Sequence, residues 1–129
     1  MRNVARILVG LVVLFNLALG VGFFLDPAQM GLKFFLTSLG TQGLATMRAD
    51  LTAFFITAAV FALAGAWRGW RTPLLVPLSL YSIAIIGRAV GLVADGAPDT
   101  AFPPMVVEGV VIAILALGYR LFDAEAVKR

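Results

Sequence analysis

Residues 46–93 are TMRADLTAFFITAAVFALAGAWRGWRTPLLVPLSLYSIAIIGRAVGLV. This stretch holds two apolar runs, 46–67 and 72–93. Each is close to the roughly 20 residues that an α-helix needs to cross the hydrocarbon core of a bilayer. Only residues 68–71 separate the runs, so the two helices must pack side by side in opposite directions. The stretch therefore predicts an antiparallel pair of transmembrane helices.

Two further apolar runs, 6–25 and 103–122, extend this pattern over the chain. Of 129 residues, 61% are hydrophobic and 13% charged, with a mean hydropathy of +1.00. A soluble domain of this size cannot bury so much apolar surface. No segment alternates with period two as a barrel strand does. We predict an all-α integral membrane protein, with residues 1–129 forming a single up-down-up-down four-helix bundle.

The run 6–25 follows a short basic start and resembles a signal peptide. It is longer than the 7–15 apolar residues typical of such a peptide, and further spans follow it. We expect an uncleaved first helix. Ala18 and Gly20 form a small-x-small pair that leaves cleavage open.

Residues 26–45 connect the first two spans and contain Pro27, several Phe and Leu residues, and three glycines. This segment is too short and too interrupted to cross a bilayer. We expect a short helix in the membrane interface, with its apolar side chains inward and Lys33 reaching water. The alternative is a loop that folds over the bundle as a lid.

Loop charge predicts the orientation. Lys33 is the one cation in the loops on one side, whereas the opposite side carries Arg2, Arg6, Arg68, Arg71, Arg120, Lys128 and Arg129. The positive-inside rule places both termini in the cytoplasm and the protein in the cytoplasmic (inner) membrane as a multi-pass protein. The basic residues form no run with interleaved aromatics, so despite the net charge of +3 we expect no nucleic-acid partner.

The chain has no Cys and no His, which excludes disulfides, thiolate nucleophiles, Cys/His metal sites and Ser/His/Asp triads. It also lacks a phosphate-binding glycine loop. We therefore predict no catalytic residue, no metal and no cofactor. Asp50 with Glu108 is the one pair suited to acid–base chemistry, and the neighbouring Arg residues argue against a general acid. An enzymatic function stays open but is not favoured.

Four charges fall within the predicted spans: Arg48, Asp50, Arg88 and Glu108. At a rise of 1.5 Å per residue, the last three lie roughly 7 to 10 Å outward of their span midpoints, and Arg48 lies slightly further out. All four are thus expected in one layer of the outer half. A charge near the bilayer centre is costly and needs a partner.

This layer has three interpretations, of which the first two can hold together. It is a neutral ion-pair network that ties the helices together, the lining of a pocket open to the outer face, or an interface for self-association. In the pocket, Arg48 or Arg88 binds an anionic group, Glu108 orients Arg88, and Asp50 or Glu108 exchanges protons.

Two polar side chains extend the candidate site. Tyr81 lies on the helical stripe of Arg88, one to two turns deeper. Asn16 lies at the centre of the first span, where an amide bonds a neighbouring helix or forms the floor of the pocket. Small residues, including Gly87 and Gly91, predict close helix packing with no room for a wide pore.

The chain also resembles the bacterial four-helix membrane family catalogued as domain of unknown function 4345. The matching pieces are Asp26-Pro27, Arg48-Ala49, Gly87-Arg88, Asp95-Gly96 and Glu108. The chain departs from the pattern at Asp50-Leu51-Thr52, where the family carries aromatic and glycine residues. The resemblance implies a multi-pass bacterial membrane protein and supplies no activity.

Two functions follow from these observations. The first is binding or transport of a small anionic or lipid-like molecule reached from the outer side. The second is an accessory or scaffold protein whose charged cluster only ties the helices together. Expected partners are membrane lipid and a small anionic ligand, with a homo-oligomer or a partner membrane protein left open.

Overall fold

The computed structural model describes residues 1–124, so Lys128 and Arg129, used in the orientation argument, lie outside the described part. The long helices are α1 (Arg2–Leu25), α4 (Thr52–Arg68), α5 (Leu75–Ala94) and α6 (Phe102–Leu121). No β-strand forms within residues 1–124, which confirms the all-helical prediction. With the short helical turns that precede α4, α5 and α6, four helices are long and apolar enough to cross a membrane. They are Arg2–Leu25, Gly40–Arg68, Thr72–Ala94 and Asp99–Leu121.

The connection between α1 and α4 contains α2 (Pro27–Lys33), α3 (Gly40–Thr46) and the π-helical turn η1 (Met47–Leu51). Asp26 caps α2, because its carboxylate accepts a hydrogen bond from the Gln29 backbone N–H at 3.1 Å. A proline at the first helical position also favours this start. The expected short helix is therefore present. α3 and η1 continue directly into α4, so this helix begins earlier than the predicted span 46–67.

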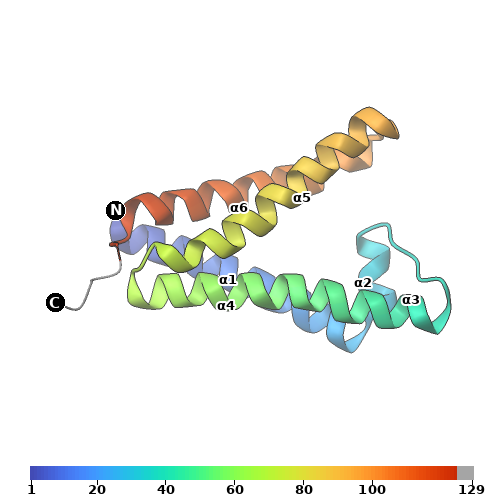
Figure 1. The fold of residues 1–129 in the computed structure, drawn as a ribbon, viewed down its shortest axis with the longest axis horizontal. Helices are drawn as coiled ribbons and strands as arrows, with labels where there is room; N and C mark the ends of the chain where they lie inside the picture. The colour runs from blue at the N-terminus through green and yellow to red at the C-terminus, as the bar shows by residue number, and fades with distance from the viewer. Residues whose placement is uncertain (125–129) are drawn as a thin grey trace.

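The helices associate as two pairs (Figure 1). α1 lies along α4, with Gly20 at a close approach: a Cβ added there would lie 2.6 Å from Cδ1 of Ile56. The core between the helices contains Val9, Ala58 and Ala62, all fully buried. α5 and α6 form the second pair.

The pairs are joined tightly at the end where α1 begins and α6 ends, which we call the closed end (Figure 1). Leu74 is fully buried there, against the glycines Gly65 and Gly118. Arg6 donates to the carbonyl oxygens of Ala66 and Trp67, at 2.8 Å each, and so caps the end of α4. α4 ends at Arg68 and is followed by Gly69, whose φ of 68° is the left-handed conformation that glycine adopts without a Cβ penalty.

At the opposite end, which we call the open end, the α5–α6 pair diverges from α1 and α4 (Figure 1). The sequence predicted that Gly87 and Gly91 would pack closely against another helix. This prediction is wrong: a Cβ at Gly87 would meet nothing within 4 Å, and one at Gly91 would reach only Oδ2 of Asp95, at 4.0 Å. These glycines lie toward the open end of α5, where this helix has separated from α1 and α4 (Figure 1) but remains joined to α6 by the ion pair between Arg88 and Glu108.

Candidate functional site

A cavity of about 760 Å³ lies between the two helix pairs toward the open end. Its walls are mainly aromatic and aliphatic, with a few polar groups, a composition typical of small-molecule sites. The lining residues are Phe15, Leu19, Lys33, Phe34, Phe35, Leu36, Leu51, Phe54, Phe55, Tyr81, Ala84, Arg88, Pro98, Thr100, Ala101, Pro103, Pro104, Val107 and Glu108.

An ion pair joins α5 and α6 in the wall of this cavity. Arg88 Nε donates to Glu108 Oε1 at 2.7 Å. Glu108 is only 8% exposed, whereas the Arg88 side chain is 39% exposed. The carboxylate is therefore held inside the protein while part of the guanidinium stays accessible. Because Arg carries five N–H donors and this bond uses one, Arg88 retains donors for another acceptor.

The second oxygen of Glu108, Oε2, is buried and has no hydrogen-bond partner within residues 1–124. Buried polar atoms in proteins almost always have a partner, so an unpaired carboxylate oxygen is costly for stability. A feature that lowers stability is typical of a functional site. Glu108 is thus a stronger functional candidate than a carboxylate with both oxygens satisfied.

Tyr81 and Asn16 form a second polar contact deeper in the bundle. Tyr81 Oη donates to Asn16 Oδ1 at 2.8 Å, and Asn16 Nδ2 donates to the Val12 carbonyl at 2.9 Å. Asn16 is fully buried and does not line the cavity, whereas Tyr81 does. Asn16 therefore ties α1 to α5 and fixes the orientation of Tyr81 in the cavity wall.

Arg48 and Asp50 do not join these groups. Both side chains are exposed, and neither lines the cavity. Arg48 Nε donates to the Phe24 carbonyl at 3.0 Å, and Asp50 forms no ion pair with the described residues. Of the expected four-charge layer, the structure brings together only Arg88 and Glu108.

Two features account for this difference. Arg48 and Asp50 both lie in the π-helical turn η1, which accommodates an extra residue. Counting 3.6 residues per turn back from α4 therefore predicts the wrong side of the helix for these two side chains. In addition, α4 has separated from α5 at this end of the molecule (Figure 1). Equal depth in a membrane therefore does not bring the four charges into contact.

Sequence reasoning missed the aromatic wall and one cation. Phe55 stacks on Phe23 with ring centroids 5.9 Å apart, and Phe34 packs against Phe23 at 5.2 Å. These contacts hold the end of α2 against the helices, and Lys33, the last residue of α2, lines the cavity. The alternative in which residues 26–45 fold over the bundle as a lid could have indicated these residues, because it places that segment against the helices.

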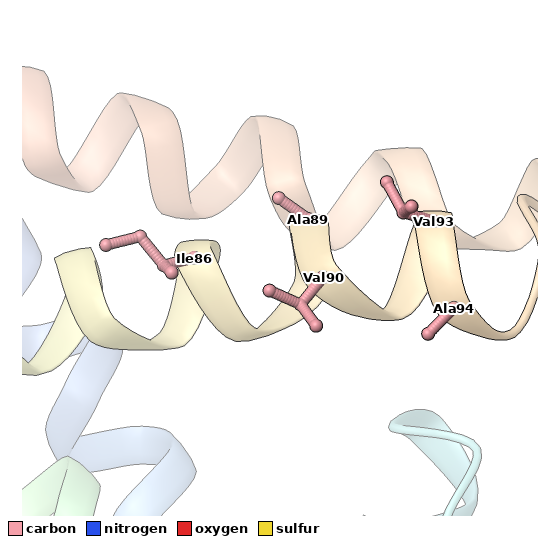
Figure 2. Close-up of a pocket in the computed structure, with 5 residues that line it drawn as sticks. All are labelled: Ile86, Ala89, Val90, Val93 and Ala94. Carbon is pink, nitrogen blue, oxygen red and sulfur yellow. The ribbon is translucent and has the colours of Figure 1, made fainter.

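A second hollow, of about 440 Å³, lies on the surface of α5 (Figure 2). The five lining residues all belong to that helix: Ile86, Ala89, Val90, Val93 and Ala94. Their side chains are purely hydrocarbon, so this surface offers no group that could select a ligand by hydrogen bonding or charge. The cavity between the helix pairs is the better candidate site.

Comparison with known proteins adds no assignment to this geometry: no family model, no curated protein and no solved structure matches the chain. Within residues 1–124, no three His, Cys, Asp or Glu side chains lie close enough together to hold a metal ion. The chemistry available at the site is that of two cations, one carboxylate, one phenol and the hydroxyl of Thr100 in an otherwise apolar cavity.

Proposed function

We propose that this chain is a multi-pass membrane protein that binds an anionic, lipid-like molecule in the cavity between its helix pairs. The observation that carries the proposal is Arg88: it is fixed by a buried carboxylate, retains unused donors and lies in the wall of a large apolar cavity. An amphiphile with one anionic group and a hydrocarbon tail complements both features.

The membrane part of the proposal rests on the four long apolar helices. Many of their large apolar side chains are exposed, including Ile83, Val90 and Val93, and a bilayer would cover them. Arg2, Arg6, Arg68, Arg71 and Arg120 come from the closed end of the bundle. The positive-inside rule then puts the closed end at the cytoplasmic face of an up-down-up-down bundle, and the cavity in the outer half.

The ligand is bound in two parts. Its tail lies along the aromatic wall formed by Phe34, Phe54 and Phe55, which packs against hydrocarbon by van der Waals contact. Its anionic group accepts hydrogen bonds from Arg88, and bonds between two ionised groups are roughly twice as strong as neutral ones. Glu108 keeps the guanidinium in place before the ligand arrives.

The resemblance to domain of unknown function 4345 agrees with this proposal in one respect. It implies a multi-pass protein of a bacterial membrane, and we propose the inner membrane as the location. It provides no ligand, so the chemistry of the cavity alone supports the binding function.

A binding titration tests the proposal. The purified protein in a non-ionic detergent is titrated with dodecanesulfonate and, separately, with dodecanol, which has the same chain without the charge. We expect the sulfonate to bind at least about tenfold more tightly, a difference of about 1.4 kcal/mol. Equal binding of the two amphiphiles would contradict an anion site.

Matched variants locate the site. Arg88→Gln combined with Glu108→Gln removes the guanidinium without stranding a buried carboxylate, and we expect it to weaken sulfonate binding by about tenfold. Arg120→Gln removes an exposed cation at the closed end and is expected to bind like the wild type. Equal behaviour of the two variants would exclude Arg88 as the anion-binding group and favour a structural role for the ion pair.

A further inference from the structure

The charges that line the cavity define the charge of its ligand. Among the described lining residues, Lys33 and Arg88 are cationic and Glu108 is anionic. Asp95 and Asp99, in the loop between α5 and α6, are exposed and do not line the cavity. The cavity therefore holds one formal positive charge in excess.

Lys33 and Arg88 reach the cavity from different parts of the fold. Lys33 is the last residue of α2, whereas Arg88 belongs to α5. Phe34, next to Lys33, packs on Phe55 with ring centroids 6.0 Å apart, and this contact holds the end of α2 on the α1–α4 pair. The cavity is thus lined by one cation from α2 and one from α5.

We infer that the site selects amphiphiles with a single negative charge, and that Lys33 is the second cation that sets this preference. The inference rests on the proposed function. A singly charged group cancels the formal excess charge of the cavity, whereas a doubly charged group leaves one negative charge without a partner. An uncompensated charge between apolar walls is unfavourable, and Glu108 opposes any second negative charge.

Two probes of the same length and similar head shape separate charge from geometry. Dodecanesulfonate carries one negative charge, and dodecyl phosphate at pH 8.5 carries nearly two, since the second pKa of a phosphate monoester is about 6. We expect the wild type to bind the sulfonate about tenfold more tightly than the phosphate. Dodecanol serves as the uncharged reference.

Two variants change the charge of the cavity in opposite directions. Glu108→Gln raises the excess to two positive charges, and we expect it to bind the phosphate at least as tightly as the sulfonate. Lys33→Gln lowers the excess to zero, and we expect the advantage of the sulfonate over dodecanol to shrink by about tenfold. Lys33 is exposed, so this variant keeps the test valid even if Glu108→Gln does not fold. Arg71→Gln, at the closed end, is the control and should show the preference of the wild type.

The failure of this inference differs from the failure of the proposed function. If the wild type binds phosphate as tightly as sulfonate, and both more tightly than dodecanol, the single-charge preference is wrong while the anion site stands. The inference is also overturned if Glu108→Gln still binds the sulfonate more tightly than the phosphate and Lys33→Gln keeps the full advantage of the sulfonate over dodecanol. If neither anion binds more tightly than dodecanol, the proposed function fails and the inference fails with it.

Discussion

Tyr81 and Asn16 form a buried hydrogen bond between α5 and α1 that positions the phenol in the cavity wall. Tyr81→Phe removes the donor and leaves the Asn16 oxygen buried without a partner. Interhelical hydrogen bonds within membranes contribute about 0.6 kcal/mol on average and up to about 1.7 kcal/mol. We expect a loss of stability of about 1 kcal/mol, measured by unfolding in mixed micelles.

A double-mutant cycle separates this bond from packing. Asn16→Leu removes the stranded acceptor, so Tyr81→Phe should cost less in the Asn16→Leu background than in the wild type. Equal costs in both backgrounds would show that the hydrogen bond does not couple the two helices.

Glu108 distinguishes a structural ion pair from a functional one. Glu108→Gln keeps an oxygen that can accept from Arg88 and removes a buried charge. Because Arg88 is 39% exposed, losing the carboxylate does not strand a buried cation. We expect the free energy of unfolding to stay within about 0.5 kcal/mol of the wild type, or to rise. A fall of about 3 kcal/mol, as on breaking a fully buried pair, would favour the network that only ties helices together.

At the scale of the elements, the α1–α4 contact depends on Gly20. Gly20→Val would place its side chain against Ile56, and we expect a loss of about 1–3 kcal/mol from overpacking. Gly10→Val is the matched control in the same helix, because a Cβ at Gly10 would meet nothing within 4 Å. Thermal unfolding of both variants tests this; equal midpoints would show that α1 and α4 do not pack as described.

The secondary structure also explains why the ion pair of the candidate site was predictable from the sequence, whereas the places of Arg48, Asp50 and Lys33 were not. Arg88 and Glu108 lie in regular helices near span ends, where sequence position and a constant rise per residue determine depth. Arg48 and Asp50 lie in a π-helical turn, which hydropathy does not reveal. Lys33 ends a short helix that is followed by a turn at Phe35, which adopts a positive φ of 57° that is uncommon for an aromatic residue. No sequence pattern indicated that conformation.

At the scale of the whole molecule, the four long apolar helices followed from hydropathy and loop length alone. Hydropathy and loop length did not predict that these helices associate as two pairs that separate at one end. Leu74 is fully buried where the pairs join, and hydropathy alone does not indicate which end of the spans such a side chain holds together. The GxxxG at Gly87 suggested close packing where the helices in fact diverge.

The proposed orientation is testable because the chain contains no Cys. Single substitutions Thr37→Cys, between α2 and α3, and Thr72→Cys, at the start of η2 (Thr72–Leu74), place thiols at opposite ends of the bundle. A membrane-impermeant maleimide should label Thr37→Cys in intact spheroplasts and Thr72→Cys only after permeabilisation. The reverse pattern would invert the orientation, and labelling of both in intact spheroplasts would contradict a membrane-spanning bundle.

The most direct test of the binding function is photoaffinity labelling with a dodecanesulfonate that carries a diazirine in its tail. We predict that mass spectrometry finds the label on the cavity wall of α4, at Phe54 and Phe55, and that excess dodecanesulfonate suppresses it. The variant with Arg88→Gln and Glu108→Gln should lose this labelling. Label confined to the outer face of α5, at residues such as Ile83 and Val93, and unaffected by excess sulfonate, would contradict a specific site between the helix pairs.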